Sequence, residues 1–150
     1  MRLLTEGDGF DRVLRALEPL ACPQPGAVRA AFTVAREHTN RYGTLHGGLQ
    51  ATLVDVVGTA ALVTLPWQSV GGVTTDLSVS CLAGVALGER VIVDAEVLHE
   101  GKQLACVRVR LSRQRDGKLC MEGRHSKYVA YRLGASGASK RLAEGPRSNL

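Results

Sequence analysis

The chain has 150 residues, of which 45% are hydrophobic and 22% charged, so it can form one domain with an apolar core but not two. Its formal net charge of +5 suits an anionic partner without identifying one. The four cysteines and four histidines lack the close spacing of metal ligands, and we expect no metal site and reduced, mostly packed cysteines.

The N-terminal part predicts a helix followed by a strand. Apolar residues recur at helical spacing from Phe10 to Leu17, which predicts a short amphipathic helix over residues 10–20. Two prolines and a glycine at residues 23–26 would end it. Residues 27–35 are then a plausible first strand.

The central segment predicts a long buried helix. Between residues 42 and 75, Asp55 is the only side chain that is firmly ionised at neutral pH. Apolar residues from Leu49 to Val63 follow a helical spacing with a broad face, and Pro66 would stop the helix. A membrane span needs roughly 20 uninterrupted apolar residues. Glycines, threonines, Gln50 and Asp55 interrupt this segment, so a buried helix and no membrane span are expected.

Beyond Gly71 and Gly72 the hydrophobic period changes to two, which is typical of strands with one buried face. The alternation runs over residues 91–98 and 105–112, and a further strand is predicted over residues 119–131. Hairpin turns are expected at residues 100–102 and 116–117. The sequence therefore predicts an α+β fold in which an antiparallel sheet wraps around one long central helix.

Residues 133–150 are rich in small and basic residues and predict a disordered tail after a single domain over residues 1–132. The N-terminus lacks the apolar run and cleavage site of a secretory signal, which favours a cytoplasmic protein. The final Ser-Asn-Leu is a loose variant of a peroxisomal targeting signal, so a peroxisomal location is the alternative, and a mitochondrial one is also open.

The turn before the central helix could carry chemistry. His46, Gly47 and Gly48 lie where the helix should begin. A helix N-terminus presents free backbone N–H groups, and glycine allows a ligand to approach them. Together they could form an oxyanion hole for a polarised carbonyl. The alternative is an ordinary glycine-rich helix start.

Asp55 is the second candidate. A carboxylate on a buried helix is costly unless it has a partner, and the helix itself offers no cation. One interpretation is an ion pair with a distant arginine such as Arg108 or Arg124. The other is a general base or nucleophile held in an apolar pocket.

Four segments carry a resemblance to a known family: HTNRYGTLHGGLQATLVD, GGVTTDLSVSCL, GERVIVDAEVLHEGKQLA and DGKLCMEGRHSKY. The chain resembles the phenylacetyl-CoA-thioesterase-like branch of the hotdog-fold proteins over residues 10–129. The resemblance implies a hotdog fold and hydrolysis of fatty or aromatic acyl-CoA to a free acid and CoA.

The resemblance also implies roles for five residues. The amide of Gly47 would bind the thioester carbonyl, which Asn40 would help to polarise. His46 would support the same hole, or would only cap the helix. Asp55 would activate water or attack directly. Thr74 stands where the family has a water-orienting serine, and its hydroxyl offers the same donor and acceptor; an ordinary strand threonine is the alternative.

Substrate binding is implied for a larger set of residues. These are Cys81, Leu82, Ala83, Gly84, Val85, Ala86, His99, Glu100, Gly101, Lys102, Gln103, Leu104 and Tyr128. Lys102, His99, Arg124 and Lys127 are candidates for phosphate contacts, although each alone could be a solvated surface charge. Ala86 replaces an expected lysine and Gly84 an expected proline, which would weaken CoA binding or move it to other basic residues.

The implied partners are acyl-CoA and further copies of the chain. We expect a homodimer whose active sites each borrow residues from both protomers, paired again into a homotetramer. No separate cofactor is expected, because CoA is part of the substrate. The alternatives are a hotdog acyl-CoA hydratase or dehydratase, which usually has a histidine and an aspartate close together on one helix, and a non-catalytic acyl-CoA-binding protein. No motif supports nucleic-acid binding.

Overall fold

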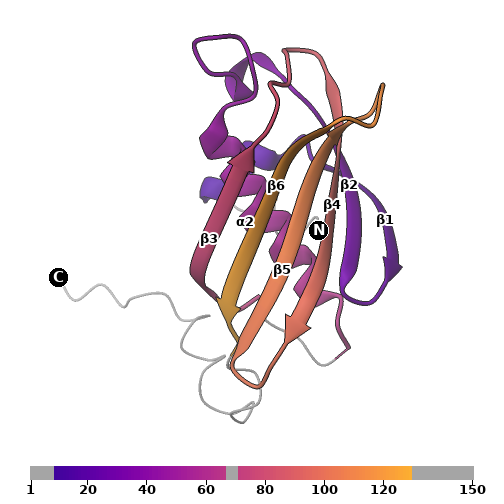
Figure 1. Ribbon diagram of the computed structural model, residues 1–150, viewed down its shortest axis with the longest axis vertical. Helices are drawn as coiled ribbons and strands as arrows, with labels where there is room; N and C mark the ends of the chain where they lie inside the picture. The colour runs from indigo at the N-terminus through magenta and orange to yellow at the C-terminus, as the bar shows by residue number, and fades with distance from the viewer. Residues whose placement is uncertain (1–8, 67–70, 130–150) are drawn as a thin grey trace, which may run out of the picture.

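The computed structural model describes residues 9–66 and 71–129, which form one antiparallel sheet and one α-helix (Figure 1). The six strands lie in the order β1-β2-β4-β5-β6-β3. The strands are β1 (Glu18–Gln24), β2 (Ala27–Thr33), β3 (Val73–Cys81), β4 (Arg90–Glu100), β5 (Leu104–Arg113) and β6 (Leu119–Tyr128). The helices are α2 (Gly47–Val63) and two short 3-10 turns, η1 (Phe10–Leu14) and η2 (Arg36–His38).

Helix α2 crosses one face of the sheet and packs against strands β2 to β6 (Figure 1). Most of its side chains are buried, as the broad apolar pattern predicts. Gly48, Ala51 and Asp55 keep access to solvent along one flank, and Gly47 and Val63 are exposed at the two ends of the helix. No helix among the described residues is long and apolar enough to cross a membrane.

The helix lies unusually close to strand β6. A Cβ atom at Gly123 would be 2.4 Å from Val54 Cγ2, so only glycine fits beneath the helix there. The other face of the sheet is polar and carries cross-strand ion pairs such as Arg29–Asp94 and Arg110–Glu122. Because buried and charged residues alternate along the strands, one face of the sheet packs against the helix and the other is exposed to solvent.

The prediction for the N-terminal part is wrong in one respect. Only Phe10–Leu14 is helical, and Glu18–Gln24 forms the edge strand β1 instead of the end of a helix. Every residue of β1 is exposed, and Pro19 and Pro23 fit an edge strand because one of its sides needs no N–H donors. Strand β2 follows at Ala27 as expected and ends at Thr33.

The remaining predictions of secondary structure are confirmed within the described residues. Helix α2 ends at Val63 and both hairpin turns are present; Gly117 adopts a positive φ of 69°. Strand β6 ends at Tyr128, three residues earlier than predicted. The predicted tail over residues 133–150, with its final Ser-Asn-Leu, lies outside the described residues. The sheet wrapped around one helix is the arrangement that the hotdog resemblance implies.

Candidate active site

The start of α2 is capped by the residue before it. Nδ1 of His46 accepts a hydrogen bond from the amide of Gly48 at 2.9 Å. Since Nδ1 is the acceptor, the neutral ring carries its proton on Nε2, and this exposed N–H is a free donor. The amide of Gly47 is exposed and has no hydrogen-bond partner among the described residues. This helix start therefore presents two N–H donors to an incoming oxygen atom.

Asn40 organises the loop that leads to these donors. Its Oδ1 accepts hydrogen bonds from the amides of Tyr42 and Thr44, at 2.9 and 3.2 Å. Its Nδ2 donates to Thr44 Oγ1 at 3.0 Å. An amide NH₂ group carries two hydrogens, so one N–H of Asn40 remains for a ligand.

Asp55 is less buried than the sequence analysis assumed. Its side chain keeps 45% of its accessible surface, because it lies on the open flank of α2. Neither Arg108 nor Arg124 is its partner. Its Oδ1 instead lies 3.5 Å from Nε2 of His125 and 3.7 Å from Nζ of Lys127, both on strand β6. The interpretation as an ion pair with a distant arginine is therefore wrong.

His125 connects Asp55 to Thr74. The His125 ring is fully buried, and its Nε2 lies 2.9 Å from Thr74 Oγ1. Burial lowers the pKa of His125 to about 4, and the Lys127 ammonium acts in the same direction, whereas Asp55 opposes both. The ring is therefore neutral at physiological pH. Asp55, His125 and Thr74 come together from α2, β6 and β3.

Lys127 completes this cluster and is not a surface cation. The residue is 4% exposed, and its Nζ donates to Thr59 Oγ1 at 2.6 Å. The suggested phosphate contact of Lys127 is therefore wrong for this chain, because its ammonium points inward. Arg124 remains exposed on the opposite face of β6.

His125 and Thr59 were not predicted to belong to the site, and Lys127 was predicted only as a candidate phosphate contact. A usable signal was nevertheless present in strand β6, because Gly123, His125 and Lys127 share the buried face. Two ionisable residues at inward positions of an alternating strand are expected to have polar partners on the helix that covers them.

The first group of predicted substrate-binding residues lies beside the start of α2. The segment from Cys81 to Ala86 leaves β3, and Ala86 forms a β-bridge with Thr44. The amide of Leu45 donates to the carbonyl of Val85 at 2.8 Å. Leu82 and Ala86 are exposed, whereas the Val85 side chain is buried and can offer a ligand only its backbone.

The second group lies at the opposite end of the sheet. Leu104, in the hairpin between β4 and β5, pairs with Tyr128, which also pairs with Val73 at the start of β3. The predicted contacts from His99 to Leu104 and Tyr128 are therefore neighbours. Strand β3 separates Val73 from Cys81 by eight residues, which corresponds to roughly 25 Å.

The predicted site residues of one chain lie in two separate groups, which are called half-sites below. The first half-site contains Asn40, His46, Gly47 and the segment from Cys81 to Ala86. The second contains Asp55, Thr74 and the residues around Tyr128. Gly47 and Asp55 are eight residues apart on α2, which places their backbones about 12 Å apart. A base and an oxyanion donor both act within about 3 Å of the reacting group, so a backbone separation of about 12 Å is long for two residues of one chain that serve the same carbonyl.

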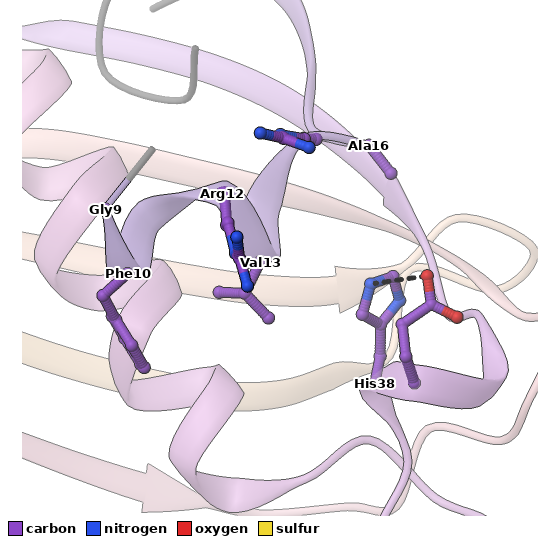
Figure 2. Close-up of a pocket in the computed structure, with 8 residues that line it drawn as sticks. Gly9, Phe10, Arg12, Val13, Ala16 and His38 are labelled. Atoms are coloured by element: carbon purple, nitrogen blue, oxygen red, sulfur yellow. Dashed lines mark ion pairs between the residues drawn. The ribbon is translucent and has the colours of Figure 1, made fainter. Parts of the chain in front are cut away.

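A hollow of about 880 Å³ lies elsewhere, between η1 and η2 (Figure 2). Phe10, Arg12 and Val13 line one side, and the other side holds His38, whose Nε2 is 3.8 Å from Glu37. None of the predicted site residues lines it. Within the described residues, no group of three histidine, cysteine or acidic side chains could hold a metal ion.

Residues 42–120 match the thioesterase superfamily, a range that contains Gly47, Asp55 and Thr74. Human acyl-coenzyme A thioesterase 13 is 40% identical over 129 residues, which cover 86% of this chain and 91% of the human protein. The chain therefore belongs to the thioesterase superfamily.

Solved structures agree with this assignment. Zebra fish thioesterase superfamily member 2 is 39% identical and superposes with a TM-score of 0.81, over 85% of this chain and 91% of that one. The Escherichia coli PaaI protein from the phenylacetic acid degradation operon has a TM-score of 0.69 at 21% identity, over 79% of this chain and 88% of that one, and shows the shared fold alone. The resemblance to this group and the hotdog fold are confirmed.

Proposed function

We propose that the protein hydrolyses acyl-CoA to a free acid and CoA by attack of water on the thioester carbonyl. The human relative is named an acyl-coenzyme A thioesterase, and this chain covers 91% of its length. Thioester hydrolysis needs a donor for the carbonyl oxygen, a base for water and no electron transfer. The reaction therefore needs no resident cofactor, because CoA enters and leaves as part of the substrate.

The first half-site supplies the oxyanion hole in this proposal. As water adds, negative charge moves onto the carbonyl oxygen, and donors fixed in advance stabilise that charge. The amide of Gly47 is available at the positive end of the α2 dipole. The free N–H of Asn40 and the Nε2–H of His46 border the same helix start.

The second half-site supplies the base. The Asp55 carboxylate is half-exposed, so water can reach it. His125 links it to Thr74, because the His125 ring contacts both residues. Asp55 removes a proton from the attacking water, and the tetrahedral intermediate then expels the CoA thiolate. A hydratase usually has a histidine and an aspartate close together on one helix, but α2 contains Asp55 and no histidine, so hydrolysis is the better proposal.

Two chains complete each site in this proposal. The open flank of α2, with Gly48, Ala51 and Asp55, would face the same flank of a second chain in the opposite direction. Gly47 of one protomer would then lie near Asp55 of its partner. The 12 Å separation estimated within one helix supports this arrangement. A twofold axis produces two equivalent sites, and a homotetramer would be a pair of such dimers.

The observation that carries the proposal is the Asp55 carboxylate, which is accessible to water on an otherwise buried helix. The test is Asp55→Asn, assayed by CoA release from acyl-CoA esters with a thiol-reactive dye. We expect a loss of about 10²–10⁴-fold with the fold retained. Undiminished CoA release by a folded Asp55→Asn variant would contradict the assignment. A panel from acetyl- to long-chain and phenylacetyl-CoA would identify the acyl group.

A further inference from the structure

Lys127 is a buried cation that the proposed reaction does not use. Its side chain is 4% exposed, on the face of β6 that packs against α2. Taking an ammonium out of water costs several kcal/mol unless its hydrogen bonds and its charge are compensated. A lysine at an inward strand position therefore needs a specific explanation.

Thr59 determines the direction of the Lys127 side chain. The hydroxyl of Thr59 donates to the backbone carbonyl of Asp55 at 2.7 Å, one turn earlier on α2. Its oxygen is then free to accept the hydrogen bond from Lys127 Nζ at 2.6 Å. A strand residue is thereby attached to the same helical turn that carries Asp55.

The charges around Lys127 come from three elements. Burial lowers the pKa of Lys127, and the carboxylates of Asp55 in α2 and Asp11 in η1 oppose this effect. His125, on the same strand, is neutral. Asp55 is thus the charged partner that forms an ion pair with Lys127, with 3.7 Å between Oδ1 and Nζ.

Both neighbours of Asp55 on β6 approach the same oxygen of its carboxylate. Lys127 Nζ and His125 Nε2 lie 3.7 and 3.5 Å from Oδ1. The Asp55 side chain nevertheless keeps 45% of its accessible surface. The carboxylate is therefore contacted by the protein through Oδ1 and is still accessible to water.

We propose that Lys127, held by Thr59, is a positioning residue that orients the Asp55 carboxylate through Oδ1 for proton transfer from water. This inference rests on the function proposed above. Because Lys127 is only 4% exposed, it would act through Asp55 and not by contacting the substrate. Its removal should therefore lower kcat by about 10²-fold, the loss expected when a catalytic group moves by about 1 Å, and should leave KM unchanged.

The experiment compares kcat and KM of purified full-length variants. Lys127→Met removes the charge and keeps the side-chain length, and Lys118→Met removes an exposed lysine as the matched control. Thr59→Val removes the hydroxyl that holds Nζ, and Thr59→Ser restores it. We expect kcat to fall in Lys127→Met and Thr59→Val, and wild-type values in Lys118→Met and Thr59→Ser.

A double variant separates positioning from a purely structural role. In an Asp55→Asn background, Lys127→Met should lower the residual rate no further, because the carboxylate that it positions is absent. An unchanged kcat in folded Lys127→Met, or equal losses in both backgrounds, would overturn the inference and leave the proposed function intact. Failure of the wild type to hydrolyse any acyl-CoA would overturn both.

Discussion

Thr74 Oγ1 lies 2.9 Å from Nε2 of His125, and this contact joins the edge strand β3 to the buried face of β6. The register between the two strands shifts just after Thr74, between Thr74 and Asp76. Such an irregularity redirects side chains, and here the Thr74 hydroxyl reaches a ring that lies 3.5 Å from Asp55. The threonine is therefore connected to the proposed base without touching it.

Thr74→Val should lose both activity and stability. The isosteric valine removes the partner of a fully buried imidazole nitrogen, which should cost about 1–3 kcal/mol of unfolding free energy. It also removes the hydroxyl proposed to orient water, so kcat should fall. Thr74→Ser keeps the hydroxyl and should keep both properties. Urea denaturation and CoA release measure the two effects, and equal behaviour of valine and serine would exclude a role for the hydroxyl.

His125 should make the stability of the protein sensitive to acid. Its pKa is lowered from 6.5 to about 4 in the folded state, so the unfolded chain binds the proton first as the pH falls. Stability is therefore complete above pH 6.5 and decreases between pH 6.5 and 4, by up to about 1.4 kcal/mol per pH unit. Denaturation curves between pH 7 and about pH 5 test this before most carboxylates titrate. The slope should be absent in His125→Gln.

Gly47→Ala should separate catalysis from folding. A Cβ atom at Gly47 would meet nothing within 4 Å, and the first helical position accepts alanine. The melting temperature should therefore stay near that of the wild type. The added methyl group would stand beside the amide proposed to bind the carbonyl, and kcat/KM should fall by about 10²-fold or more. Full activity in Gly47→Ala would place the oxyanion hole elsewhere.

Subunit mixing tests whether each site is shared. Asp55→Asn and Gly47→Ala affect different half-sites, so each homodimer should be inactive. A mixed dimer regains one site in which both residues are intact, and random reassociation should restore about a quarter of wild-type activity. Mixing two preparations that both carry Asp55→Asn is the control. No recovery after demonstrated exchange would mean that Gly47 and Asp55 serve one site within one chain.

The sequence predicted the central helix and the antiparallel strands because both follow from hydrophobic period. The broad apolar run from Leu49 to Val63 predicts a buried helix. The alternation over residues 105–112 predicts a strand with one buried and one exposed face. The helix predicted over residues 10–20 was wrong because its apolar spacing also suits a 3-10 turn that buries Leu14. Pro19 and Pro23 then follow on an edge strand.

The alternation in β6 indicates that His125 and Lys127 point inward, but it does not identify Asp55 as their partner. His125 and Lys127 are 70 and 72 residues further along the chain, and only the pairing of β6 with β3 and β5 brings them beneath α2. The expected partner was an arginine, whereas the buried cation is a lysine that donates a hydrogen bond to the hydroxyl of Thr59. The distance between Thr74 and Cys81 likewise follows from strand geometry, because β3 places these two residues toward opposite ends of the sheet.

The placement of Gly47 and Asp55 on one helix has a consequence for how the protein responds to concentration. If no single chain holds a complete site, dilution below the dissociation constant of the pair would switch off hydrolysis without unfolding any chain. Turnover per molecule would then rise with the amount of protein present. A higher expression level would then raise the total catalytic rate in two ways: it would increase the number of chains and also the fraction of chains that are paired.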